Sequence, residues 1–70
     1  MKAIISREHE SVPGYIPECG TDNRTLVSHY KTLNGMRRFA KRYAQGRAYR
    51  IEFFTDSNFY GDAFRTETGR

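Results

Sequence analysis

The 70-residue sequence has few of the features that cross-link small proteins or direct them to a membrane. Its single cysteine, Cys19, cannot form a disulfide within the chain, and a secreted domain of this size would normally need such cross-links. The apolar run near the N-terminus, Ala3-Ile4-Ile5, is too short for a signal sequence, and no stretch approaches the length of a membrane helix. We therefore expect a cytoplasmic protein without a targeting segment.

Signatures of catalysis and metal binding are also missing from the sequence. His9, His29 and Cys19 are too few and too dispersed for a metal site, and no Gly-rich phosphate-binding loop is present. Cys19 lies in a turn beside Glu18 and Asp22, whose carboxylates disfavour a reactive thiolate. We expect a protein that is not an enzyme, with no catalytic residues, no metal and no cofactor.

The apolar content is nevertheless sufficient for one small fold. Hydrophobic residues make up 37% of the chain and aromatic residues 14%, while a charged fraction of 29% does not indicate disorder. At this length a hydrophobic core supplies only about 3–5 kcal/mol of net stability, so each local cost matters. We expect residues 1–70 to form a single domain in which residues 66–70 are a frayed tail.

Alternating apolar and polar residues predict strands at residues 2–7, 24–31 and 48–55, and residues 59–65 offer a further short strand. Apolar residues from Leu33 to Ala44 recur with helical spacing and predict a helix over residues 33–45. Thr32 or Asn34 would cap its N-terminus, and Gly46 would stop it. This order, ββαβ with an optional last strand, predicts an α+β fold in which one amphipathic helix packs on an antiparallel sheet of three to four strands.

The charge distribution is the clearest indication of function. No acidic residue lies between Lys31 and Ile51, whereas acidic residues are scattered on both sides of this segment. Its seven basic residues are Lys31, Arg37, Arg38, Lys41, Arg42, Arg47 and Arg50. On a helical wheel, the four from 37 to 42 fill an arc separate from the apolar one. A solvated face is one interpretation, but like charges at i, i+4 cost roughly 0.5–1 kcal/mol for two pairs, which favours a binding face.

Arginine-rich surfaces suit phosphate groups, because guanidinium binds them with two hydrogen bonds. We therefore expect a nucleic acid or a nucleoprotein complex as the partner of the seven basic residues. Possible base-stacking groups are Tyr49, Phe54, Phe59 and Tyr60. No RNP1 strand, GXXG loop, zinc finger or helix-turn-helix is found, so contacts to the nucleic-acid backbone would dominate over readout of bases.

In a second hypothesis, the same arginines bind an acidic surface of a host protein. Its contact aromatics would be Phe59, Tyr60 and Phe64. A membrane-bound helix ranks last, because it would remove Met36, Phe39 and Tyr43 from a small core; we expect no membrane partner. The oligomeric state stays open, and a two-fold dimer through the edge of the last strand is one option.

The chain also resembles the small accessory proteins of bacteriophages and mobile elements, which include anti-CRISPR-type inhibitors of host defence. The resemblance covers the whole chain in size and layout, with a basic helix segment Leu33-Asn34-Gly35-Met36-Arg37-Arg38-Phe39-Ala40-Lys41-Arg42. It implies that the protein occupies a nucleic-acid or acidic surface of a CRISPR-Cas or other defence complex. Many such inhibitors are acidic, whereas this chain is basic, and no functional residue carries over position by position.

Overall fold

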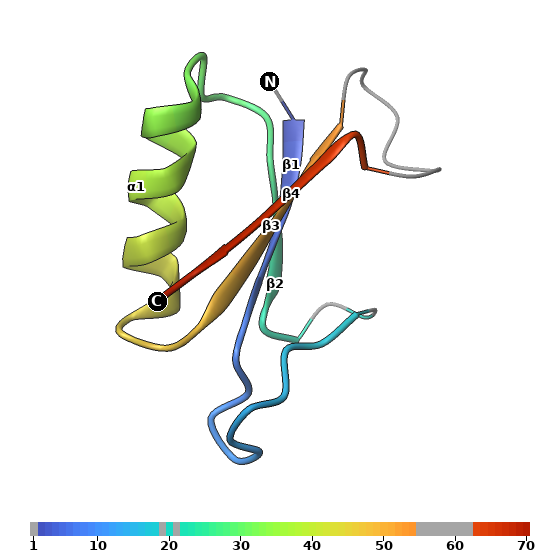
Figure 1. Cartoon of the computed structure of the whole chain (residues 1–70), viewed down its shortest axis with the longest axis vertical. Helices are drawn as coiled ribbons and strands as arrows, with labels where there is room; N and C mark the ends of the chain where they lie inside the picture. Colours follow the sequence, from blue (N-terminus) through green and yellow to red (C-terminus); the bar gives the residue numbers. More distant parts are fainter. Residues whose placement is uncertain (1, 19, 21, 55–62) are drawn as a thin grey trace.

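A computed structural model describes residues 2–18, 20, 22–54 and 63–70 of the chain. Within these residues there are four strands and one helix, and the strands form one antiparallel sheet in the order β2-β1-β3-β4, covered on one face by the helix (Figure 1). The elements are β1 (Lys2–Arg7), β2 (Arg24–Val27), α1 (Leu33–Ala44), β3 (Tyr49–Phe54) and β4 (Arg65–Gly69). The predicted α+β fold is confirmed.

The core lies between the sheet and the helix. Alternate residues of a strand point to opposite faces, and Ala3 and Ile5 of β1 therefore share the face toward α1 with their cross-strand partners Phe53 and Ile51. From the helix, Met36 and Ala40 close this layer. The buried cluster consists of Ala3, Ile5, Val27, Met36, Ala40, Ile51 and Phe53.

Local chemistry fixes both ends of α1. The hydroxyl of Thr32 accepts a hydrogen bond from the Gly35 backbone N–H at 3.0 Å, so Thr32 is the N-cap among the two predicted candidates. At the other end Gln45 adopts the left-handed conformation with φ of 53°, and Gly46 follows with φ of 86°. The helix thus ends within one residue of its predicted limit.

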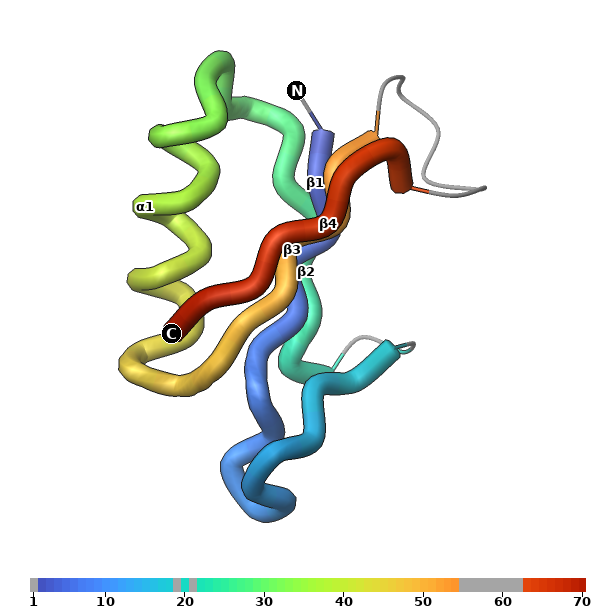
Figure 2. Tube along the Cα trace, in the orientation of Figure 1, coloured from blue at the N-terminus to red at the C-terminus, as the bar shows by residue number. Residues whose placement is uncertain are grey.

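The second strand is shorter than predicted. It ends at Val27, the partner of Ala3, although the sequence alternation continues to residue 31. After Val27 the chain leaves the sheet, and residues 28–32 cross to the start of α1, where the ring of Tyr30 contacts that of Phe39 (Figure 2). His29 and Tyr30 are consequently placed beside the helix and not within the sheet.

The prediction of a frayed tail at residues 66–70 is wrong. Residues Arg65–Gly69 form β4 and pair with β3 in the register Tyr49 with Gly69 and Phe53 with Arg65. The helix reinforces this edge strand through an ion pair between Arg37 and Glu67, described below. Of the strand suggested at residues 59–65, residues 59–62 lie outside the described residues, and residue 65 begins β4.

Candidate functional site

Three exposed cations occupy the outer face of α1: Arg38, Lys41 and Arg42, which we call the basic stripe. They face outward because the opposite side of the helix supplies the buried Met36 and Ala40. Within the described residues, no carboxylate forms an ion pair with any of the three. The stripe therefore presents three uncompensated positive charges to the surroundings.

Arg37, although adjacent in sequence, has all of its bonding partners within the protein. Its Nε and Nη2 donate to the two carboxylate oxygens of Glu67 at 2.8 and 2.7 Å, and its Nη1 donates to Asn34 Oδ1 at 3.1 Å. Arg65 Nε also donates to Glu67, at 2.8 Å. These bonds lower the pKa of Glu67 to about 2, and the hydrogen bond from Arg37 has the largest effect. Burial of the carboxylate opposes this shift in pKa. Arg37 is thus a link between α1 and β4.

Arg47 and Arg50 are also held by the fold. Arg47 Nη1 donates to the Glu8 carbonyl oxygen at 3.1 Å and so connects the turn after α1 to the end of β1. Arg50 donates to the carbonyl of Pro17 and lies 3.5 Å from the Glu52 carboxylate. Strand alternation puts Arg50 on the sheet face opposite α1, because its neighbour Ile51 is buried under the helix. Neither arginine extends the basic stripe.

Lys31 is exposed in the segment that leads from the sheet to α1. It lies directly before Thr32, the N-cap, and no ion pair reaches it among the described residues. The structure therefore divides the seven basic residues predicted from the sequence into two groups. The exposed group is Lys31 with the basic stripe, and the internally bonded group is Arg37, Arg47 and Arg50.

Four aromatic rings lie in contact with one another along one side of the basic stripe, and we call them the aromatic row: His29, Tyr30, Phe39 and Tyr43. The centroids of His29 and Tyr30 are 4.5 Å apart, those of Tyr30 and Phe39 are 5.6 Å apart, and Phe39 and Tyr43 are parallel at 6.2 Å. His29 is exposed and the other three rings are half-buried. Rings and cations thus form one continuous surface.

Sequence reasoning missed the aromatic row. It placed His29 and Tyr30 in a strand, and it assigned Phe39 and Tyr43 to the apolar arc alone. A signal was present nonetheless, because Phe39 and Tyr43 directly follow Arg38 and Arg42 in sequence. Two aromatic–basic neighbours, four residues apart, must run side by side along a helix.

The aromatic residues predicted as binding groups have different surroundings. They are Tyr49, Phe54, Phe59, Tyr60 and Phe64. Tyr49 packs against the core cluster, and Phe54 is buried, so neither presents a free ring face beside the stripe. Phe64 is 57% exposed, next to the start of β4. Phe59 and Tyr60 lie outside the described residues.

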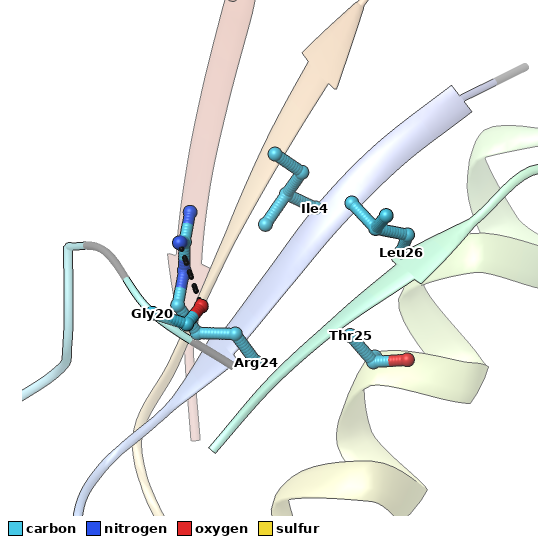
Figure 3. A pocket seen from close by; sticks show the side chains of 5 residues that line it. All are labelled: Ile4, Gly20, Arg24, Thr25 and Leu26. Atoms are coloured by element: carbon cyan, nitrogen blue, oxygen red, sulfur yellow. Dashed lines mark hydrogen bonds between the residues drawn. The ribbon is translucent and has the colours of Figure 1, made fainter. Parts of the chain in front are cut away.

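The sheet face opposite α1 carries a separate small hollow of about 140 Å³. Ile4 and Leu26, cross-strand partners on β1 and β2, lie side by side at its apolar wall, and Arg24 donates to the Gly20 carbonyl at its rim (Figure 3). Arg24 also contacts Ser6 and Glu52. The hollow is therefore apolar, and its one guanidinium is already bonded, unlike the basic stripe.

No family model matches the chain, and no curated protein or solved structure shows significant similarity to it. In the part of the chain that the structure describes, no helix is long and apolar enough to cross a membrane. The same residues contain no group of three or more histidine, cysteine or acidic side chains arranged to hold a metal ion. What the surface can do chemically follows from its own groups: cations that are free to bind anions, beside one exposed ring, His29, that is supported by three half-buried rings.

Proposed function

We propose that this protein binds nucleic acid, alone or in a nucleoprotein complex, through the basic stripe, and that it is not an enzyme. One observation carries the proposal. Arg38, Lys41 and Arg42 are exposed without a carboxylate partner, on the same helix where Arg37 is fully paired with Glu67. The protein thus neutralises one helix arginine and leaves three neighbouring cations available for an anionic partner.

The geometry of the stripe fits phosphate contacts. Arg38 and Arg42 are one helical turn apart, about 6 Å along the axis, which suits neighbouring phosphates of one strand. Their like charges repel at this spacing and cost roughly 0.2–0.5 kcal/mol at low salt. An anion between them would turn this cost into attraction, since it would interact favourably with both guanidinium groups.

An acidic surface of a host protein, such as a component of a defence complex, would use the same cations. Among the described residues, no contact favours an acidic protein surface over phosphate groups as the partner. Direct binding to purified nucleic acid separates the two partners, because phosphate contacts release counterions and make the affinity depend steeply on salt.

The test is fluorescence anisotropy with a labelled single strand and a labelled duplex, each about 20 nucleotides long, across a range of salt concentrations. Three to four phosphate contacts predict a slope of log affinity against log salt of about −2 to −4. Lys41→Ala should reduce the slope magnitude by about 0.7–0.9. Lys2→Ala is the matched control, because Lys2 lies on β1 with its side chain on the sheet face opposite α1.

Absence of binding to both probes at low salt would refute the proposal, as would binding that is indifferent to salt. Equal effects of Lys41→Ala and Lys2→Ala would also contradict it, because the interface would then not be the stripe. If neither probe binds but a purified acidic host protein does, and Arg38→Glu abolishes that complex, the inhibitor function is supported in its place.

A further inference from the structure

We infer that the nucleic acid recognised by this protein is single-stranded, and that an unpaired base stacks on the exposed ring of the aromatic row, His29, while the phosphates contact the basic stripe. The inference rests on the proposed function, because it assigns the substrate class of the same surface. It is carried by the contacts that join rings to cations.

Tyr30 connects the two parts of this surface. Its ring lies against the first turn of α1, where a Cβ added to Gly35 would come within 2.9 Å of Tyr30 Cδ1. Its hydroxyl oxygen accepts a hydrogen bond from Arg42 Nη2 at 3.1 Å. The ring therefore lies beside the first turn of the helix, and the side chain of Arg42 reaches back to it, so that a guanidinium is held at the end of an aromatic ring. A base and its adjoining phosphate need that pairing of groups.

His29 is the outermost ring of the aromatic row. It is exposed, with its centroid 4.5 Å from that of Tyr30 at an interplanar angle of 37°, and it meets Phe39 edge-on at 6.2 Å. The half-buried rings beneath it pack against the core cluster and give it a firm support. Exposed Lys31 follows two residues later. The surface thus has an accessible ring, backing by packed side chains, and exposed cations nearby in sequence and on α1.

The aromatic row discriminates between single strands and duplexes. In a duplex the bases are stacked on one another, so only phosphates would reach this convex helix face, and the rings would add nothing. An unpaired strand offers both phosphates and free base faces. Stacking of one base on a protein ring changes affinity by about 5- to 100-fold. The arrangement therefore favours a single strand, and because stacking uses the π-face common to all bases, it favours weak sequence preference.

The decisive experiment compares affinities for single-stranded oligo(dT), single-stranded oligo(U) and a duplex of the same length, at one low salt concentration, by fluorescence anisotropy. We expect the full chain to bind at least one single strand about 10-fold more tightly than the duplex. His29→Leu, which keeps side-chain bulk without a ring, should weaken single-strand binding by at least about 5-fold and leave duplex binding unchanged. His29→Phe, which keeps a ring, should retain single-strand affinity.

A second readout uses intrinsic fluorescence, because the chain has five tyrosines and no tryptophan. A base that stacks on His29 lies beside Tyr30 and should quench tyrosine emission when a single strand is added. Tyr30→Phe keeps the ring but loses the hydroxyl that accepts a hydrogen bond from Arg42, so single-strand binding should persist in a weakened form and the quenching should decrease. Circular dichroism of each variant verifies that the fold is retained.

The outcomes separate this inference from the proposed function. Salt-dependent binding with equal or tighter affinity for the duplex would overturn the inference and leave the proposed function standing. The same holds if His29→Leu binds single strands as the unmodified protein does. Failure to bind any of the three probes would overturn both.

Discussion

Two groups of basic side chains in this protein have opposite surroundings. The first group donates hydrogen bonds to oxygen atoms of distant segments, and we call its members the structural arginines: Arg7, Arg37, Arg47 and Arg50. The second group is the basic stripe, in which Arg42 has only the neutral Tyr30 hydroxyl as a partner, and Arg38 and Lys41 have none among the described residues. Residue type is nearly the same in both groups.

The difference lies in what each group can reach. Each structural arginine bonds to a residue at least 30 positions away in sequence and so joins two distant segments of the chain. Such links matter in a domain whose core supplies only about 3–5 kcal/mol. Residues of the basic stripe contact no carboxylate among the described residues and therefore contribute little to the stability of the fold. In this protein the presence of a bonding partner within the fold, and not the residue type, separates a structural role from a binding role.

The largest effect should follow from removing Arg7, which donates to Asn23 Oδ1 at 3.0 Å and to the Tyr43 carbonyl at 2.9 Å and lies 4.5 Å from the Tyr43 ring centroid. Arg7→Ala should lower the free energy of unfolding by about 1–3 kcal/mol, because hydrogen bonds to charged groups and a cation–π contact are lost. Urea denaturation followed by circular dichroism measures this change. Arg42→Ala is the matched control, with an expected change of under about 0.5 kcal/mol.

Nucleic-acid affinity should follow the opposite order, reduced in Arg42→Ala and unchanged in Arg7→Ala under conditions where both are folded. If both substitutions destabilise the protein equally, the division into two groups is incorrect.

An intermediate effect is expected at Glu67. Its pKa falls from 4.5 to about 2 in the folded protein, chiefly through the hydrogen bond from Arg37. Because the folded-state pKa lies below the unfolded one, the carboxylate stabilises the fold above about pH 4.5, and this contribution disappears as the pH falls toward 2. The pair is close to solvent, which screens the interaction and keeps the stabilisation well below what the shift in pKa alone would suggest.

Glu67→Gln isolates this contribution from that of the other carboxylates. At pH 7 the variant should be less stable than the unmodified protein, and the difference should shrink as the pH is lowered from 4.5 to 2, measured by urea denaturation at each pH. The substitution also frees Arg37 from its ion pair. Affinity for nucleic acid at low salt should therefore rise modestly, by about 2- to 5-fold. A difference in stability that is constant across this pH range would show that the ion pair does not stabilise β4.

The parts of the fold that depend on local pattern could be predicted from sequence, and the parts that depend on partners could not. Residues 2–7 alternate around a β-branched centre, and Thr32 offers a cap, so β1 and the start of α1 were predicted correctly. The end of β2 at Val27 goes with the packing of Tyr30 against the helix, and β4 depends on pairing with β3 and on Arg37 from across the fold. No short stretch of the sequence contains the information about these distant partners.

The candidate site follows the same rule. A helical wheel correctly separates the cations of α1 from its apolar residues, because both are spaced along one element. It cannot separate Arg37 from Arg38, since the carboxylate that pairs with Arg37 is 30 residues away. The aromatic row escaped prediction for a related reason. Tyr30 reaches the helix only because β2 stops at Val27.

The smallest expected effect, and the one that tests the comparison most directly, is that of Arg38→Glu. Arg38 repels Arg42 at i, i+4, whereas Glu at position 38 would attract it in the favourable order, so stability should rise by about 0.5 kcal/mol at low salt. The gain should vanish near 1 M salt, where the screening length is about 3 Å. Urea denaturation at the two salt concentrations measures it, and Arg38→Gln should give an intermediate value.

Affinity for nucleic acid should fall in the same variant, because a phosphate contact becomes a repulsion. A substitution that strengthens the fold while it weakens binding identifies a residue whose charge is maintained at the expense of stability, as the proposed function requires. Loss of stability in Arg38→Glu would instead class Arg38 with the structural arginines. The basic stripe would then be a further set of bonds within the fold and not a surface for a partner.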